Sequence, residues 1–188
     1  PVVNEMKNNS EKVNGYFTGS SAAIVAIVGS NVYLSAADRA LYEKSELYSK
    51  SRMVNTVECS LSRSNFEMKL PIQNAGESVK FVTLDKAGRR SATISLEVAD
   101  AAPNVPVIQE ICDIEDYLYG QVTNVNESGS VAVTVGNRTY TGEILPGGTF
   151  AVQTNGATSG EVVSVTASDI KDGTARTSAA AVTTVQPY

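Results

Sequence analysis

The second half of this sequence repeats the first. Residues 1–6 read Pro-Val-Val-Asn-Glu-Met, and residues 106–111, which lie 105 positions later, read Pro-Val-Ile-Gln-Glu-Ile. A glycine follows fourteen residues after each proline, at Gly15 and Gly120. Self-similarity at a fixed period marks an array of structural units. A period of this length is that of a small domain, so the sequence predicts two copies of one domain in series, at residues 1–100 and 101–188.

Further matches show where the copies differ. The apolar segment 24–29 corresponds to 131–136, and a tyrosine follows each segment after four residues, at Tyr33 and Tyr140. The next matched aromatic residue is Phe66 in the first copy and Phe150 in the second, so the separations from tyrosine to phenylalanine are 33 and 10 residues. The first copy therefore carries an insertion of about 23 residues, between Leu34 and Arg63.

The residue pattern of the second copy is typical of short β-strands. Val131, Val133 and Val135 alternate with smaller or polar residues, the period of a half-buried strand. Turn residues recur at regular spacing, as in Gly136-Asn137 and Pro146-Gly147-Gly148. Hydrophobic residues make up 42% of the chain but aromatic residues only 6%, so β-branched and small side chains must fill the core. About seven strands in this order predict an antiparallel β-sandwich.

The insertion has a different pattern. Ser35 followed by Asp38 has the spacing of a capping box. Behind it, apolar and aromatic residues recur at helical spacing, which predicts a helix over roughly 36–50 and then a strand over 53–61. The junction between the copies, at 97–106, carries Pro103 and Pro106, so we expect a linker stiffer than a Gly/Ser tether.

The turns near the end of each copy carry a family resemblance. Residues 160–173 read Gly-Glu-Val-Val-Ser-Val-Thr-Ala-Ser-Asp-Ile-Lys-Asp-Gly, with Ser178 further on, and the first copy has Asp85 to Ser91 at the same place. This order of glycine, alternating Val/Thr, an Asp/Gly turn and a serine resembles the bacterial immunoglobulin-like (Big-type) repeats. Arg89 and Thr174 stand where the family commonly has asparagine after the turn glycine, and the second turn is one residue longer in this alignment.

The resemblance implies a fold and a setting. The fold is all-β, two tandem immunoglobulin-like antiparallel sandwiches, the first with a helical insertion. Such domains are tandem modules of bacterial surface or secreted proteins, including adhesins, and they space or present a binding region. We accordingly expect a piece of a longer extracellular protein, with neighbouring domains of the same chain and a glycan or protein ligand as partners.

Catalysis and nucleic-acid binding find little support in the residues. The chain has no histidine, so it can form neither a Ser-His-Asp triad nor a histidine metal site. Its net charge is −5, which disfavours binding to phosphate backbones, and no apolar stretch has the length of a membrane span. We therefore predict a protein that is not an enzyme, does not bind nucleic acid and does not insert into a membrane.

Calcium is the cofactor that the sequence allows. Some members of the resembled family bind Ca²⁺ at domain junctions, and acidic or amide residues cluster near this junction. Ca²⁺ prefers carboxylate and carbonyl oxygens, although no Asp-x-Asp-x-Asp-Gly loop is present. The alternative is an ordinary acidic surface. The candidate ligands are Asp100, Asn104, Glu110 and Asp113.

The insertion is the candidate for specific recognition, because only the first copy has it. Tyrosine and arginine are favoured at binding hot spots, so a contact face on the helix would comprise Arg39, Tyr42, Lys44 and Tyr48. In the alternative interpretation the helix caps an open end of the sandwich and its tyrosines are packed.

Two other biological settings stay open. One is an accessory module, spacer or glycan-binding, of a secreted carbohydrate-active enzyme, which a flat strip of exposed aromatics would favour. The other is a phage tail or virion decoration protein, which trimer formation would support. Cys59 and Cys112 occupy non-equivalent positions, so they are either two reduced thiols or one bridge between the domains.

Overall fold

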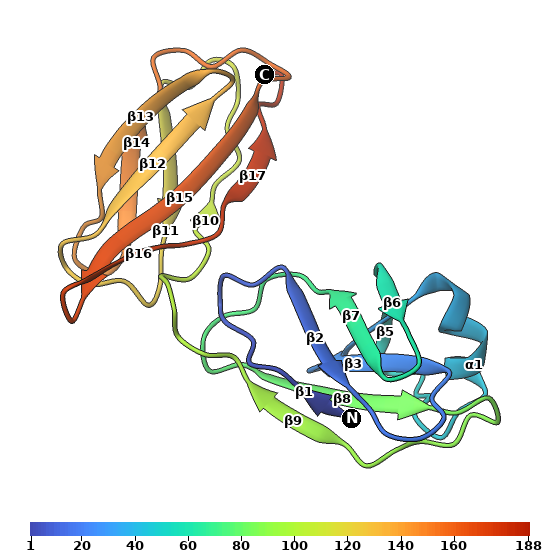
Figure 1. The fold of residues 1–188 in the computed structure, drawn as a ribbon. Helices are drawn as coiled ribbons and strands as arrows, with labels where there is room; N and C mark the ends of the chain where they lie inside the picture. Colours follow the sequence, from blue (N-terminus) through green and yellow to red (C-terminus); the bar gives the residue numbers. More distant parts are fainter. The chain divides into compact units, whose positions relative to one another are not determined.

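A computed structural model describes all residues, 1–188, and divides the chain into two compact units, Pro1–Ala99 (unit 1) and Asp100–Tyr188 (unit 2). Strands make up 46% of the chain and helices 4%. Each unit packs one β-sheet against another around an apolar core, so the expected pair of immunoglobulin-like sandwiches is confirmed (Figure 1). None of the helices has the length and apolar character needed to span a bilayer.

Unit 1 has a four-stranded and a five-stranded sheet. The first has the strand order β1-β2-β7-β6, and the second β5-β4-β3-β8-β9. The strands of the first sheet are β1 (Val2–Val3), β2 (Lys12–Tyr16), β7 (Asn65–Lys69) and β6 (Cys59–Leu61). Those of the second are β5 (Met53–Thr56), β4 (Asn31–Leu34), β3 (Ala23–Val28), β8 (Ser78–Leu84) and β9 (Ile94–Glu97).

Unit 2 repeats this arrangement with eight strands. Its smaller sheet has the order β10-β11-β14, and its larger one β13-β12-β15-β16, with β17 also paired to β15. The smaller sheet is made of β10 (Val107–Ile108), β11 (Tyr117–Gln121) and β14 (Thr149–Gln153). The larger contains β13 (Arg138–Glu143), β12 (Ser130–Val135), β15 (Val162–Lys171), β16 (Thr174–Thr177) and β17 (Ala181–Thr184).

The matched glycines mark the same close approach in both units. Gly15 lies opposite Val3 on β1 and Phe66 on β7, and Gly120 lies opposite Ile108 on β10 and Phe150 on β14. A Cβ on Gly120 would lie 2.3 Å from the Phe150 ring, and one on Gly15 would lie 2.1 Å from the Val2 carbonyl oxygen. Only glycine leaves room for the aromatic ring there, which explains why a glycine stands at this matched position in both copies.

The insertion completes a second core in unit 1. The inner core lies between the sheets and includes Ile24 and Phe66, whereas Val25 faces the other way, into a cluster with Tyr42 and Leu47. Residues 36–47 thus cover the outer side of the five-stranded sheet (Figure 1). Both faces of β3 are buried, which is why its sequence, Ala-Ile-Val-Ala-Ile-Val, is apolar throughout.

The helix of the insertion is shorter than predicted. A 3₁₀ turn, η1 (Ala36–Asp38), leads into α1 (Arg39–Glu43), and turns follow where the prediction continued the helix to residue 50. The expected capping box is wrong, because neither Ser35 nor Asp38 caps a helix through its side chain. The helical spacing reflects instead the burial of Tyr42 and Leu47 against the sheet.

The strand expected over 53–61 is two strands that join different sheets. β5 pairs in parallel with β4, a departure from the antiparallel pattern that the crossover through α1 permits. β6 pairs with β7 on the other sheet. The insertion therefore adds one edge strand to each sheet of unit 1.

Candidate ligand-binding site

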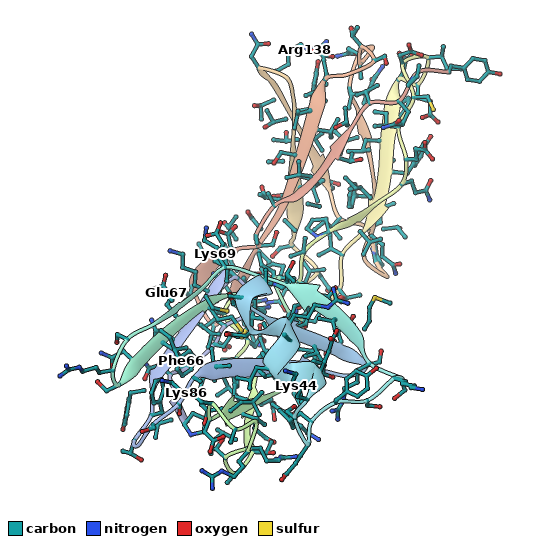
Figure 2. The ribbon with its side chains drawn as sticks, turned by 90° about the vertical axis from the view of Figure 1, so that its right-hand side faces the viewer. Lys44, Phe66, Glu67, Lys69, Lys86 and Arg138 are labelled. Carbon is teal, nitrogen blue, oxygen red and sulfur yellow. The ribbon has the colours of Figure 1, made fainter.

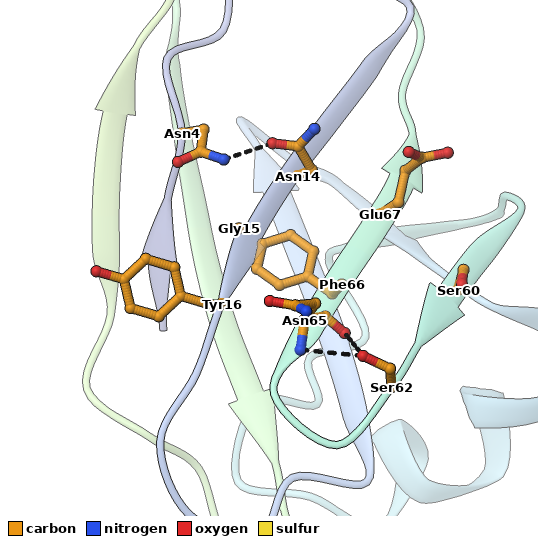
Figure 3. A pocket seen from close by; sticks show the side chains of 9 residues that line it. All are labelled: Asn4, Asn14, Gly15, Tyr16, Ser60, Ser62, Asn65, Phe66 and Glu67. Atoms are coloured by element: carbon orange, nitrogen blue, oxygen red, sulfur yellow. Dashed lines mark hydrogen bonds between the residues drawn. The ribbon is translucent and has the colours of Figure 1, made fainter.

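A shallow polar hollow of about 370 Å³ lies on the outer face of the four-stranded sheet in unit 1 (Figure 3). Alternation along the strands creates this face. On β2 the sequence Lys-Val-Asn-Gly-Tyr turns Val13 toward the core and leaves Asn14 and Tyr16 exposed, and on β7 Asn65 and Glu67 are exposed in the same way. The lining comprises Asn4, Asn14, Gly15, Tyr16, Ser60, Ser62, Asn65, Phe66 and Glu67.

Strand register brings these polar groups together from distant parts of the chain. Asn14 lies opposite Glu67, which in turn lies opposite Ser60. Tyr16 lies opposite Asn65, and together these pairs form two neighbouring rows of polar side chains across three strands.

Hydrogen bonds fix part of this arrangement. Asn4 Nδ2 donates to Asn14 Oδ1 at 2.6 Å, and the Asn65 backbone N–H donates to Ser62 Oγ at 3.2 Å (Figure 3). The Glu67 carboxylate lies 3.3 Å from the Nζ atom of Lys12, a residue that does not line the hollow. Asn14 is thereby held in place by Asn4, and the Tyr16 side chain lies exposed on the same strand.

The insertion supplies one wall of the hollow. Ser60 lies on β6 and Ser62 follows directly after it, and both fall within the segment that unit 2 lacks. In unit 2 the corresponding sheet ends at β14. The outward positions differ as well, since register places Tyr119 where unit 1 has Asn14, and Ala151 where it has Glu67.

Unit 2 presents an aromatic face at the equivalent place. Tyr117 and Tyr119 are exposed on β11, with their rings stacked at a centroid distance of 6.2 Å. Their cross-strand partners, Gln153 and Ala151, are uncharged. The two units therefore display different chemistry on the same frame, amides and a carboxylate in unit 1 and tyrosines in unit 2.

The four residues predicted as a helix contact face differ in their exposure to solvent. Tyr42 is fully buried and its ring meets that of Tyr48 edge-on at 5.9 Å, so the expectation of an exposed Tyr42 is wrong. Arg39 pairs with Glu43 one helical turn later. Lys44 is exposed (Figure 2). Tyr48 is exposed as well, and a contact role for these two residues stays a prediction. For Tyr42 the alternative of a packed tyrosine is the one observed.

The predicted calcium ligands lie at separate places in unit 2. Asp100 accepts hydrogen bonds from Lys171, Arg176 and Asn124, and the Lys171 bond is the main reason that its pKa lies below the usual value. Asn104 donates to Thr123, and Asp113 accepts from the Tyr188 backbone. Glu110 is exposed.

No group of three or more His, Cys, Asp or Glu residues forms a metal-binding cluster in the chain. A junction Ca²⁺ ion stays a prediction.

Both cysteines are free thiols. Burial is the main cause that raises the pKa of the Cys59 thiol, to about 11, with the charge of Asp38 second. Burial and the nearby charge of Glu115 also raise the pKa of Cys112. Protonated thiols are poor nucleophiles, so neither side chain has the electrostatic setting of a reactive cysteine.

The hollow itself was missed by sequence reasoning, which looked to the helix of the insertion. A signal was available in residues 12–16 and 65–69, where polar and apolar side chains alternate. This alternation places Asn14, Tyr16, Asn65 and Glu67 at outward positions. What the sequence does not reveal is the register that sets these strands side by side, or that β6 extends the sheet.

Comparison with known proteins gives fold likenesses only. No protein-family model and no curated protein matches the chain. Among solved structures, the BSP domain of a biofilm-associated protein is similar over the whole chain at 17% identity and a TM-score of 0.39, with 29% of that protein covered.

Two other solved structures are similar over the whole chain. A Ca²⁺-stabilised, ice-binding adhesin of an Antarctic bacterium shows 13% identity and a TM-score of 0.40, with 48% covered. The Bacteroides ovatus SGBP-B protein, solved with a mixed-linkage heptasaccharide, shows 12% identity and a TM-score of 0.31, with 45% covered. The chain thus spans less than half the length of these three proteins.

Proposed function

We propose that this chain is a non-catalytic module of a bacterial surface or secreted protein, in which unit 1 binds a glycan and unit 2 serves as a spacer. The observation that carries the proposal is the hollow on the four-stranded sheet, with one wall built by the inserted strand β6. An insertion that adds both an edge strand and lining residues gives unit 1 a surface that unit 2 lacks.

The lining chemistry favours a ligand rich in hydroxyl groups. The amides of Asn4, Asn14 and Asn65 each offer donors and an acceptor, and Ser60 adds a hydroxyl. A sugar presents adjacent hydroxyls that both donate and accept, so it can satisfy such groups in pairs. The exposed ring of Tyr16 provides an apolar surface for the C–H face of a pyranose.

The spacer role is supported by how each unit holds its own end of the chain. The Ala99 N–H donates to the Met6 carbonyl oxygen at 2.8 Å, and its own oxygen accepts from Asn8 at 3.0 Å, all within unit 1. The next residue, Asp100, is held by Lys171 and Arg176 of unit 2. Ala99 and Asp100 are thus each fixed within their own unit, as suits compact modules arranged in series along a chain.

A glycan microarray probed with the full chain tests the proposal. We expect binding to a subset of neutral oligosaccharides, and a loss of about tenfold or more in affinity for Asn14→Ala and for Tyr16→Ala, which corresponds to one or two lost contacts. Gln121→Ala is the matched control, because Gln121 holds the position of Tyr16 in unit 2, and its affinity should be unchanged. Retention of full affinity by both unit 1 variants would contradict the proposed site.

A further inference from the structure

An aspartate and an arginine form the same cross-strand pair near the end of each unit. In unit 1 the Asp85 N–H donates to the Arg89 carbonyl oxygen, and in unit 2 Asp169 lies opposite Arg176. The serine two residues after each arginine fixes the correspondence. Ser91 Oγ accepts from the Thr83 N–H at 3.0 Å, and Ser178 Oγ accepts from the Ala167 N–H at 2.9 Å. Arg89 and Arg176 therefore hold the same place in the frame.

In unit 2 this pair is covered by the segment 100–104. Asp100 Oδ1 accepts from Arg176 Nη1 at 2.9 Å, and its Oδ2 accepts from Lys171 Nζ at 2.7 Å. The Asn124 amide holds the segment further, because its Nδ2 donates both to Asp100 Oδ1 and to the Ala102 carbonyl oxygen. Asn104 then donates to Thr123 Oγ1 at 2.9 Å. A peptide segment that carries one aspartate thus occupies this site in unit 2.

In unit 1 the same place is an open polar pocket. Thr18 and Gly19 correspond to Thr123 and Asn124, and both Gly19 and Asn124 have positive φ, at 88° and 53°. Two adjoining hollows of about 490 and 370 Å³ lie here. Both hollows are lined by Ser20, Ser21, Asp85 and Arg89. The larger is also lined by Ala22, Lys86 and Ala87. The smaller is also lined by Thr18, Thr83, Arg90 and Ser91.

The charge of this pocket is unbalanced. Lys86, Arg89 and Arg90 contribute three positive charges, and Asp85 is the only acidic residue of the lining. The Asp85 carboxylate is already used, since Oδ1 accepts from the Ala87 and Arg89 N–H groups and Oδ2 from Arg89 Nε. The side chain of Arg89 is 78% exposed, whereas that of Arg176 is 7% exposed.

We propose that this pocket of unit 1 binds a peptide segment that carries an acidic residue, with its carboxylate on Arg89 as Asp100 lies on Arg176, and with Lys86 of the lining as the second cation. Carboxylates form strong charge-assisted hydrogen bonds with guanidinium groups. The hydroxyls of Thr18, Ser20 and Ser21 provide partners for the peptide backbone, in the place where Thr123 and Asn124 hold residues 102–104.

The probe is the full chain with a second copy of the segment 100–105, Asp-Ala-Ala-Pro-Asn-Val, attached directly before Pro1. Pro1 corresponds to Pro106, so the attached segment stands to unit 1 as residues 100–105 stand to unit 2. We expect the backbone NMR resonances of 18–21 and 85–91 to shift, and the thermal midpoint of unit 1 to rise by roughly 4 to 8 °C.

Two variants make the test specific. Replacing the attached aspartate by asparagine, or introducing Arg89→Gln into the chain, should abolish both effects, and Lys86→Gln should weaken them without disturbing the Asp85–Arg89 pair. Unchanged resonances in the extended chain would overturn the proposal, as would equal shifts with the asparagine version. A pocket that responds to millimolar sulfate but not to the attached segment would show an anion site and would likewise overturn it.

Discussion

Arg176 and Asp169 form a buried two-point ion pair in unit 2, with 2.6 Å between Arg176 Nη2 and Asp169 Oδ2 and 2.8 Å between Nε and Oδ1. Their side chains are 7% and 0% exposed. The guanidinium donates two hydrogen bonds to one carboxylate, which is a strong geometry for an arginine–carboxylate pair. The same arginine also holds Asp100, so one side chain links the first residue of unit 2 to its β15–β16 hairpin.

Removing one partner of the buried pair should destabilise unit 2 strongly. Asp169→Asn leaves the Arg176 guanidinium without its main counter-charge in a buried place, and we expect a loss of roughly 3 to 5 kcal/mol in the free energy of unfolding. Asp100→Asn is the comparison, because Asp100 is partly exposed and its loss should cost about 1 kcal/mol or less. Urea unfolding followed by circular dichroism measures both, and equal costs would contradict this ranking.

The stability of unit 2 should fall in acid. The hydrogen bond from Arg176 is the main cause that holds the pKa of Asp169 below its usual value. A carboxyl group whose pKa is lower in the folded protein contributes stability above its unfolded pKa of about 3.9, and this contribution is lost as the pH falls through the folded pKa.

We therefore expect the unfolding free energy of unit 2 to decline progressively below about pH 4. Asp169→Asn should show a shallower decline over the same range. If the variant and the natural chain lose stability in parallel, Asp169 is not the group that titrates.

A methyl group on either paired glycine should strain the sandwich that contains it. In Gly120→Ala the new Cβ would lie 2.3 Å from the Phe150 ring and 2.7 Å from the Val107 carbonyl oxygen. We expect a loss of about 1 to 3 kcal/mol, the usual cost of overpacking, and a similar loss for Gly15→Ala. Gln121→Ala on the same strand points outward and should stay within about 0.5 kcal/mol of the natural chain.

Tyr42 offers a test of what the insertion contributes. Its side chain is fully buried and its hydroxyl has no hydrogen-bond partner. Tyr42→Phe removes a buried polar atom without changing the packing, so we expect stability to stay equal or to rise by about 1 kcal/mol. Tyr42→Ala should cost roughly 3 to 5 kcal/mol, because it opens a cavity under the helix. A large loss in Tyr42→Phe would mean that the hydroxyl has a bonded partner.

The repeated frame was predictable because its constraints are local. Alternating valines on β12 report a strand face directly, and the repeated proline-to-glycine spacing marks the same strand position in both copies. The helix length was not predictable from periodicity, since Tyr42 and Leu47 are buried by the sheet beneath them rather than by a continuing helix.

The correspondence of the turns was also misread. Sequence spacing aligned Arg89 with Thr174 and suggested one extra residue, whereas the hydrogen bonds of Ser91 and Ser178 align Arg89 with Arg176, with three extra residues in unit 2. The hairpin of unit 2 has a longer turn but the same strand register. An alignment gap placed from the sequence alone therefore paired Arg89 with the wrong residue. The ion pair in each unit was therefore visible only through strand pairing.

The most direct test of the ligand site is NMR mapping of backbone and side-chain amides in the full chain, titrated with an oligosaccharide that the microarray identifies. We predict shifts of the Asn4, Asn14 and Asn65 side-chain amides, which line the hollow, and an unchanged Gln121 side-chain amide in unit 2. Shifts confined to Lys44 and Tyr48 on the insertion, or to Tyr117 and Tyr119 in unit 2, would contradict it.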